Sequence, residues 1–314
     1  MLGPALLLVL AVGTRAADVK SLEAADERAS VVVARDEAEL DRLQKAYAAA
    51  RQRLDAARAA LASAQLDGLI ADWKASGAVE VVGGIDARAL NDSFVAAGGS
   101  PPFSLDVPVR KLRVLRPIEL CQGQAEADLR KGWYGSWFLP CATDRYFGER
   151  ALRDLAALPD SNKLEYVARL RIPAGVELIA GAAGAIRGEI RARVDRVYAD
   201  GAGKSVGGGG HGGTVQFWLD AKSQGKNRVS DFGLTLVRMA PIPLSGDPEL
   251  LDASMKWRKS YGDEKASRAV YAAFKTDRAA RSGAAEPLAG DLRRFESFFR
   301  ESFAKEYPGA KPLD

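Results

Sequence analysis

The chain has 314 residues, of which 47% are hydrophobic and 27% are charged, and its formal net charge is +4. These values are ordinary for a globular protein with one sizeable domain plus appendages, or with two small domains. Basic and acidic residues alternate along most of the chain, so the sequence lacks the basic footprint of a nucleic-acid-binding protein. DNA and RNA are therefore excluded as the main partner.

The first 16 residues have the features of a signal peptide. An apolar run over 2–12 is too short to cross a bilayer as a helix, and Thr14, Arg15 and Ala16 follow it as a peptidase site. We expect cleavage after Ala16 or Ala17 and a periplasmic or secreted mature protein. No later segment is long and apolar enough to anchor it, so we expect no membrane span after cleavage.

Residues 18–76 predict a long helical arm, because the stretch has no proline and its first glycine is Gly68. Apolar residues recur three and four positions apart, which is the heptad pattern of a coiled coil with alanine at many second core positions. We expect self-association or a protein partner through this arm. A helix folded back as a hairpin on the following domain and a lone solvated helix are the alternatives. The heptad residues are Leu40, Leu43, Tyr47, Ala50, Leu54, Ala57, Leu61 and Ala64.

A linker region is expected over 77–106, with a short strand ending at Gly83-Gly84, a short helix over 87–97 and a glycine- and proline-rich break over 98–102. A β-rich core domain over 107–245 follows. Its expected strands cover 107–120, 132–140 (one strand or a pair), 165–172, 176–180, 189–198, 214–219 and 232–239, with helices over 121–130 and 144–157.

Cys121 and Cys141 are the only cysteines in the chain. In an exported protein this pair predicts a disulfide bond that closes a loop of about twenty residues. The alternative is a zinc site, but two thiols and the single histidine, His211, do not make a zinc ligand set. We therefore expect no metal.

A C-terminal helical segment is expected over 246–314, where large apolar residues follow helical spacing and indicate packing surfaces. The fold class is therefore α+β: a small mixed or antiparallel β core, flanked by an N-terminal coiled-coil helix and C-terminal helices. The apolar residues of the segment are Trp257, Tyr261, Val270, Tyr271 and Phe274, and then Leu292, Phe295, Phe298, Phe299 and Phe303.

Four passages, in this order, resemble the NAD-binding core of the ADP-ribosyltransferase-like superfamily. They are KLRVLRP at 111–117, GWYGSWFL at 132–139, LPDSNKLEYVARLRIPAGVELIAGAAG at 158–184 and GGHGGTVQFWL at 209–219. The resemblance is closest to necrotizing-toxin-type NAD glycohydrolases and related bacterial toxin domains. It implies an ADP-ribosyltransferase-like β core with NAD as a substrate and no permanently bound cofactor.

The resemblance also assigns roles to residues of this chain. Arg113 or Arg116 would hold a phosphate through a bidentate guanidinium, and an aromatic ring would stack on the charged nicotinamide. Gln216 would lie at the scissile ribose, where a neutral carboxamide orients reactants and favours hydrolysis over ADP-ribosyl transfer. Gln216 and Arg113 are the expected catalytic residues. The expected NAD-binding residues are Arg113, Arg116, Trp133, Tyr134, Trp137, Gly212, Gly213 and Thr214.

The residues themselves leave a second interpretation open. The glycine run is then a hairpin loop, Gln216 a strand residue that faces solvent, the arginines surface residues and the aromatics core residues. The chain would be a non-enzymatic periplasmic or secreted interaction or assembly module with a coiled-coil arm. Whether Arg113, the aromatics at 133–137 and Gln216 line one cleft distinguishes the two interpretations.

Overall fold

The structure is a computed structural model that describes residues 16–97, 99, 101–141, 156, 164–184, 212–243 and 245–314. The chain divides into two compact units, Met1–Leu54 and Asp55–Asp314. The expected signal peptide, apart from its last residue, lies outside the described residues. So do the strand expected over 189–198 and, apart from Ala156, the helix expected over 144–157.

Helix α1 runs without interruption over Ala16–Ala75 and corresponds to the expected helical arm. In the first unit, the described side chains from Asp26 to Ala50 are all exposed. In the second unit, a stripe of α1 packs into the core, where Ala62, Leu66 and Ile70 are buried. The last part of α1 is thus held by tertiary packing, which is the main source of helix stability in proteins.

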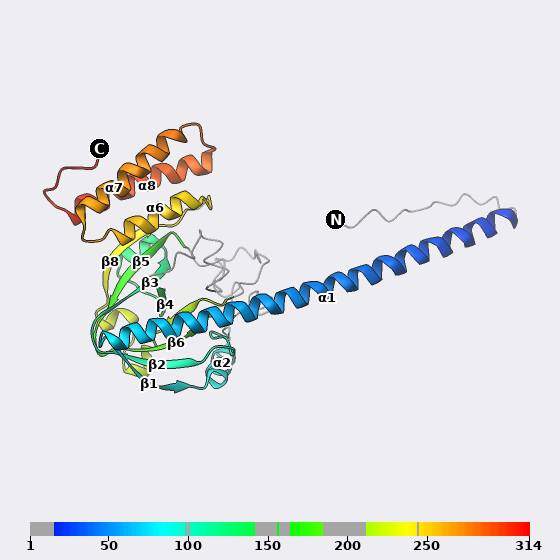
Figure 1. Ribbon diagram of the computed structural model, residues 1–314, viewed down its shortest axis with the longest axis horizontal. Coiled ribbons are helices and arrows are strands. Elements are labelled where there is room, and N and C mark those ends of the chain that lie inside the picture. Colours follow the sequence, from blue (N-terminus) through cyan, green and yellow to red (C-terminus); the bar gives the residue numbers. More distant parts are fainter. Residues whose placement is uncertain are drawn as a thin grey trace. The chain divides into compact units, whose positions relative to one another are not determined.

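The second unit contains an eight-stranded sheet with the order β1-β2-β6-β7-β4-β3-β5-β8, in which every pair of neighbours is antiparallel (Figure 1). An α+β fold with an antiparallel sheet is therefore confirmed. The strands are β1 (Val79–Ile85), β2 (Val109–Val114), β3 (Ile118–Gln124), β4 (Trp137–Pro140), β5 (Tyr166–Ile172), β6 (Glu177–Ala182), β7 (Val215–Trp218) and β8 (Thr235–Pro241).

The single strand expected over 107–120 is wrong, because the chain turns between β2 and β3. The amides of Leu115 and Arg116 both donate to the carbonyl of Ala78, at 2.7 and 3.1 Å, and Pro117 has no amide to continue a ladder. Strand β2 pairs with β1 and β6, whereas β3 pairs with β4 and β5. The helix expected over 121–130 is shorter in the structure, where only α3 (Glu126–Arg130) is helical. Residues 121–124 belong to strand β3 instead.

Different elements cover the two faces of the sheet around β6 and β7. On one face α1 packs, with the ring of Trp73 5.5 Å from that of Phe217. On the other face lies α2 (Ala87–Ala96), which begins at the N-cap Asp86, and its Phe94 contacts Trp218 at 4.9 Å. Side chains on both faces of these central strands are therefore covered.

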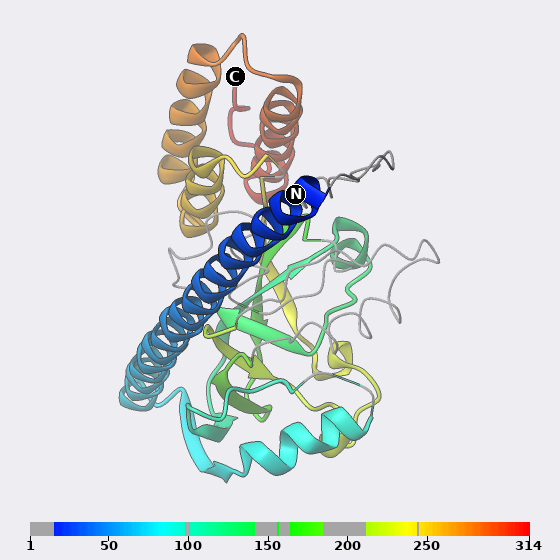
Figure 2. The ribbon, with the colours of Figure 1, turned by 90° about the vertical axis from the view of Figure 1, so that its right-hand side faces the viewer.

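The C-terminal segment folds as α6 (Pro248–Lys259), α7 (Glu264–Ala280) and α8 (Glu286–Glu306), which pack beside β8 (Figures 1 and 2). Trp257 of α6 stacks on Phe299 of α8 at 4.7 Å, and the guanidinium of Arg238 in β8 lies 4.4 Å from the Trp257 ring. The prediction of packing surfaces is confirmed for eight of the expected residues, which are buried: Trp257, Tyr271, Phe274, Leu292, Phe295, Phe298, Phe299 and Phe303. It is wrong for Tyr261, which is 42% exposed.

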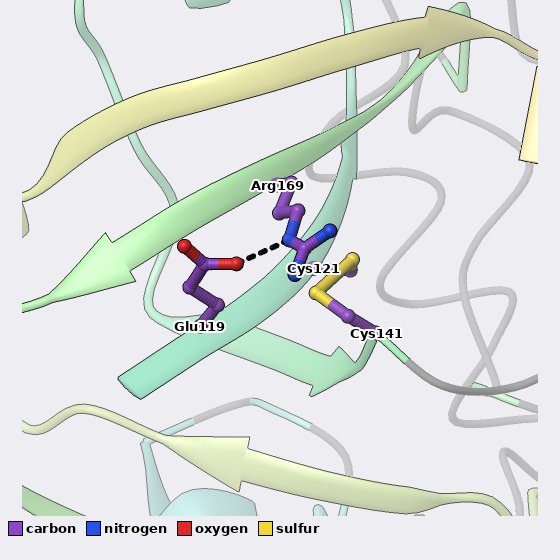
Figure 3. The surroundings of a disulfide bond; sticks show 4 residues. All are labelled: Glu119, Cys121, Cys141 and Arg169. Atoms are coloured by element: carbon purple, nitrogen blue, oxygen red, sulfur yellow. Dashed lines mark ion pairs between the residues drawn. A yellow bond between two sulfur atoms is a disulfide. The ribbon is translucent and has the colours of Figure 1, made fainter. Parts of the chain in front are cut away.

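The expected disulfide is confirmed. Cys121 of β3 and Cys141, directly after β4, are bonded, with their Cα atoms 5.1 Å apart (Figure 3). The bond joins two neighbouring strands near the ion pair between Glu119 of β3 and Arg169 of β5.

Candidate functional site

Gln216 of β7 is buried, with 6% of its surface exposed. Its side-chain amide donates to the carbonyl of Pro102 at 2.5 Å. The opposite residue on β6 is Gly181, where a Cβ would come within 2.7 Å of the Phe103 ring. The segment 101–104 can therefore lie close against the sheet and cover the carboxamide.

Arg113 of β2 is held by two carboxylates on the neighbouring strands. Its guanidinium lies 2.8 Å from Glu80 of β1 and 2.9 Å from Glu177 of β6. Hydrogen bonds from Lys111 and Arg113 lower the pKa of Glu177, and the bond to Glu177 raises the pKa of Arg113. Arg116, beyond the end of β2, donates to the carbonyl of Ser76 at 3.4 Å.

The three predicted aromatics have different environments. Trp133 is 54% exposed, with the ammonium of Lys131 4.7 Å from its ring. Tyr134 is partly buried, and burial raises the pKa of its phenol. Trp137 of β4 stacks on Trp218 at 5.7 Å with an interplanar angle of 18°.

The described end of the glycine loop adopts the conformation for which glycine is suited. Gly212 and Gly213 have φ values of +69° and +90°, in the left-handed region that side-chain-bearing residues rarely adopt. The amide of Gly213 donates to the carbonyl of Ala183 at 2.9 Å, and Thr214 is buried. The loop therefore enters β7 through a fixed turn.

Two hollows lie near these residues. The aromatic hollow, of about 630 Å³, is lined by Trp133 and Tyr134 together with Asp220, Lys222 and Arg228. Two short 3-10 helices, Lys222–Gln224 and Val229–Phe232, form one wall of it.

The arginine hollow, of about 500 Å³, is lined by Arg58 of α1, Arg88 and Asn91 of α2, Phe103 and Gly213. Sequence reasoning missed these polar residues. Asn91 is buried and bonds both the amide and the carbonyl of Phe103, at 3.1 and 2.7 Å. No local pattern reveals this contact, because it joins a helix to a loop twelve residues away.

The predicted catalytic pair shares one face of the sheet but not one hollow. Arg113 faces Glu177 on β6 and Gln216 faces Gly181, four residues further along the same strand. At about 3.4 Å per residue and about 4.8 Å per strand, their backbones are roughly 17 Å apart. Neither side chain lines the aromatic hollow or the arginine hollow.

A second candidate site is the apolar seam of α1. We define the seam by the eight heptad residues from Leu40 to Ala64, all of which are exposed. Tyr47 is 70% exposed and Leu61 is 42% exposed, whereas the neighbouring Ala62 and Leu66 are buried against the sheet. The seam and the stripe that packs into the core are therefore different faces of one helix.

Within the described residues, no group of three or more His, Cys, Asp or Glu side chains is placed to hold a metal ion. None of the helices in the described part of the chain combines the length and the apolar character needed to cross a membrane.

Comparison with protein-family models, with curated protein sequences and with solved structures gives no match for this chain.

Proposed function

We propose that this chain is an exported assembly module, in which the α1 arm joins two copies and carries a β-rich body. The observation that carries the proposal is the exposed seam of α1. Eight residues with heptad spacing lie on the solvent side of a single helix, and the described part of the second unit packs a different stripe of that helix.

The physical reason is the low stability of an isolated helix. A helix without tertiary contacts is marginal in water, and most helices in proteins are stabilised by an apolar face that packs on a partner. From Asp26 to Leu54 no described side chain of α1 is buried. A second copy placed on the seam supplies the missing partner, and the alanines at 50, 57 and 64 allow close approach of the two helices.

Export is supported by the disulfide between Cys121 and Cys141, because such bonds persist in oxidising compartments. It also agrees with the signal peptide expected from the sequence. Comparison of the chain's N-terminus before and after secretion by the host cell tests this part of the proposal. A secreted form that begins at residue 17 or 18 supports it, and retention of the uncleaved chain in the cytoplasm contradicts it.

The self-association is tested by placing the same charge on and off the seam. Ala50→Glu puts a carboxylate in the seam, whereas Ala49→Glu puts it on the adjacent, outward position of the same exposed turn. We expect the wild-type chain and Ala49→Glu to sediment as oligomers and Ala50→Glu as a monomer. A monomeric wild-type chain at all accessible concentrations, or equal behaviour of the two variants, contradicts the proposal.

A second candidate function is binding or hydrolysis of NAD, favoured by the aromatic hollow. Its lining combines Trp133 and Tyr134 with the cations Lys222 and Arg228, a combination that suits a charged ring and a pyrophosphate. The resemblance to the ADP-ribosyltransferase-like superfamily belongs to this second proposal.

Calorimetry with NAD and an assay of nicotinamide release test this second candidate. We expect Trp133→Ala to weaken binding at least tenfold, while Tyr261→Ala, which removes an exposed aromatic outside the hollow, leaves it unchanged. Absence of both NAD binding and nicotinamide release at high protein concentration rejects this candidate and leaves the assembly proposal untouched.

A further inference from the structure

We infer that the two copies pair antiparallel along α1, centred on residue 45, so that Leu40 of one copy packs against Ala50 of the other. This inference rests on the proposed self-association. It assigns the orientation and register of the two arms, which the presence of a seam alone does not fix.

The alternation of large and small seam residues favours an antiparallel pair over a parallel one. In a parallel pair each seam residue meets its own copy, so Ala50 meets Ala50 and Ala57 meets Ala57, and these layers are underfilled. In the antiparallel register, residues whose numbers add up to 90 meet. Leu40 then fills the space over Ala50, and Val33, one heptad before Leu40, fills that over Ala57. Leu43 meets Tyr47, and Leu54 meets Asp36. Even filling matters because each unfilled layer costs stability.

The charges that flank the seam favour the same orientation. Glu37 and Glu39 lie beside its first part, and Arg51 and Arg53 beside its later part. Positions that flank the antiparallel seam are offset from the core layers, so their numbers add up to 92 on one side and to 88 on the other. Glu39 therefore lies opposite Arg53 and Glu37 opposite Arg51, and the two-fold symmetry makes four attractive pairs, which set the register. In a parallel pair, the flanking position of Arg53 lies opposite that of Arg58 in the second copy, which brings like charges together.

Glu39 also forms an ion pair within its own helix. Arg42 lies 2.6 Å from Glu39, one turn earlier, and both side chains are more than half exposed. An exposed pair of this kind contributes little to stability. It does not prevent Glu39 from facing the second copy.

The seam lies on a different face of α1 from the stripe that packs on the sheet. The apolar pairs that add up to 90 lie within residues 33–57. The helices continue beyond them, so residues 16–32 of one copy run beside 58–74 of the other, where Leu61 and Ala64 are exposed and Ala62 is buried. Antiparallel pairing therefore uses a face of the helix that the described core leaves uncovered.

Disulfide trapping tests the orientation. Leu40→Cys and Ala50→Cys are prepared as separate chains, one with a size tag, and are oxidised alone and mixed. We expect a cross-linked heterodimer from the mixture and no cross-linked dimer from either chain alone. In the antiparallel register the two copies of residue 40 are about 15 Å apart along the helix, beyond the reach of a disulfide.

The outcomes separate the orientation from the self-association. Cross-linked homodimers of either single variant, from a chain that sediments as a dimer, overturn the antiparallel inference and leave the assembly proposal standing. A wild-type chain that sediments as a monomer removes both.

Reversing the charges that flank the seam tests the orientation without introducing cysteines. The double substitution Glu37→Arg and Glu39→Arg converts all four attractive pairs into repulsive ones, and we expect dimer affinity to fall about tenfold or more. Adding Arg51→Glu and Arg53→Glu to the same chain restores the pairs and the affinity. An unchanged affinity after the first pair of substitutions, or no recovery after the second, overturns the inference.

Discussion

Leu66 of α1 provides the sharpest test of how the arm is attached to the body. Its side chain is 1% exposed, within the core formed by the sheet and the last part of α1. Leu66→Ala removes three buried carbon groups, each contributing about 0.8 kcal/mol. With the cavity that remains, the expected loss in the free energy of unfolding is about 3 kcal/mol, within the usual range of about 2–5 kcal/mol.

Leu61→Ala is the matched control, because it makes the same substitution on the outward face of the same helix. Leu61 is 42% exposed, so the expected loss is below about 1 kcal/mol. Both variants are compared by urea unfolding in an Ala50→Glu background, which removes the contribution of self-association. Equal losses, or a larger loss for Leu61→Ala, would refute the assignment of inward and outward faces.

Three further predictions concern the body. Replacing Cys121 and Cys141 by alanine lowers the free energy of unfolding by about 3 kcal/mol, since the bond closes a loop with a sequence separation of 20; an unchanged urea midpoint contradicts this. The pKa of Glu177 is lowered by two neighbouring cations, so its contribution is present above its usual pKa of 4.5 and is lost as the pH falls through the lower folded value. Glu177→Gln should therefore destabilise the protein at pH 7 and not in acid, as measured by urea unfolding at each pH. Gly213→Ala brings a Cβ within 2.8 Å of an α1 arginine side chain, so it should lower the thermal midpoint more than Gly225→Ala, where φ is also positive and the space is open; equal shifts argue against that contact.

The elements that local patterns specify could be predicted from the sequence. The long arm follows from the absence of helix-breaking residues, and the expected strand over 165–172 corresponds to β5. The turn at Leu115 to Pro117 could not be located, because it depends on the Ala78 carbonyl, which lies far away in the sequence. Strand partners are also a long-range property: β5 and β6 follow each other in the chain and are not neighbours in the sheet.

In the candidate site, too, local sequence patterns predict some features, whereas contacts between distant residues could not be predicted. Alternation along β7 gives the face of Gln216, but the sequence does not show that the Pro102 carbonyl will accept its hydrogen bond. That contact requires segment 101–104 to lie on the sheet, which Asn91 of α2 and the absence of a side chain at Gly181 make possible. The seam was predictable because heptad spacing is local. Its exposure was not, because that depends on which stripe of α1 packs into the core.

Hydrogen–deuterium exchange of the full chain at several protein concentrations tests the central claim most directly. If two copies pair through the seam, amides over 33–57 of α1 become more protected as the concentration rises, while those of buried strands such as β5 do not change. A lone solvated helix exchanges at a rate independent of concentration. Identical exchange over 33–57 at the lowest and highest concentrations would contradict assembly through α1.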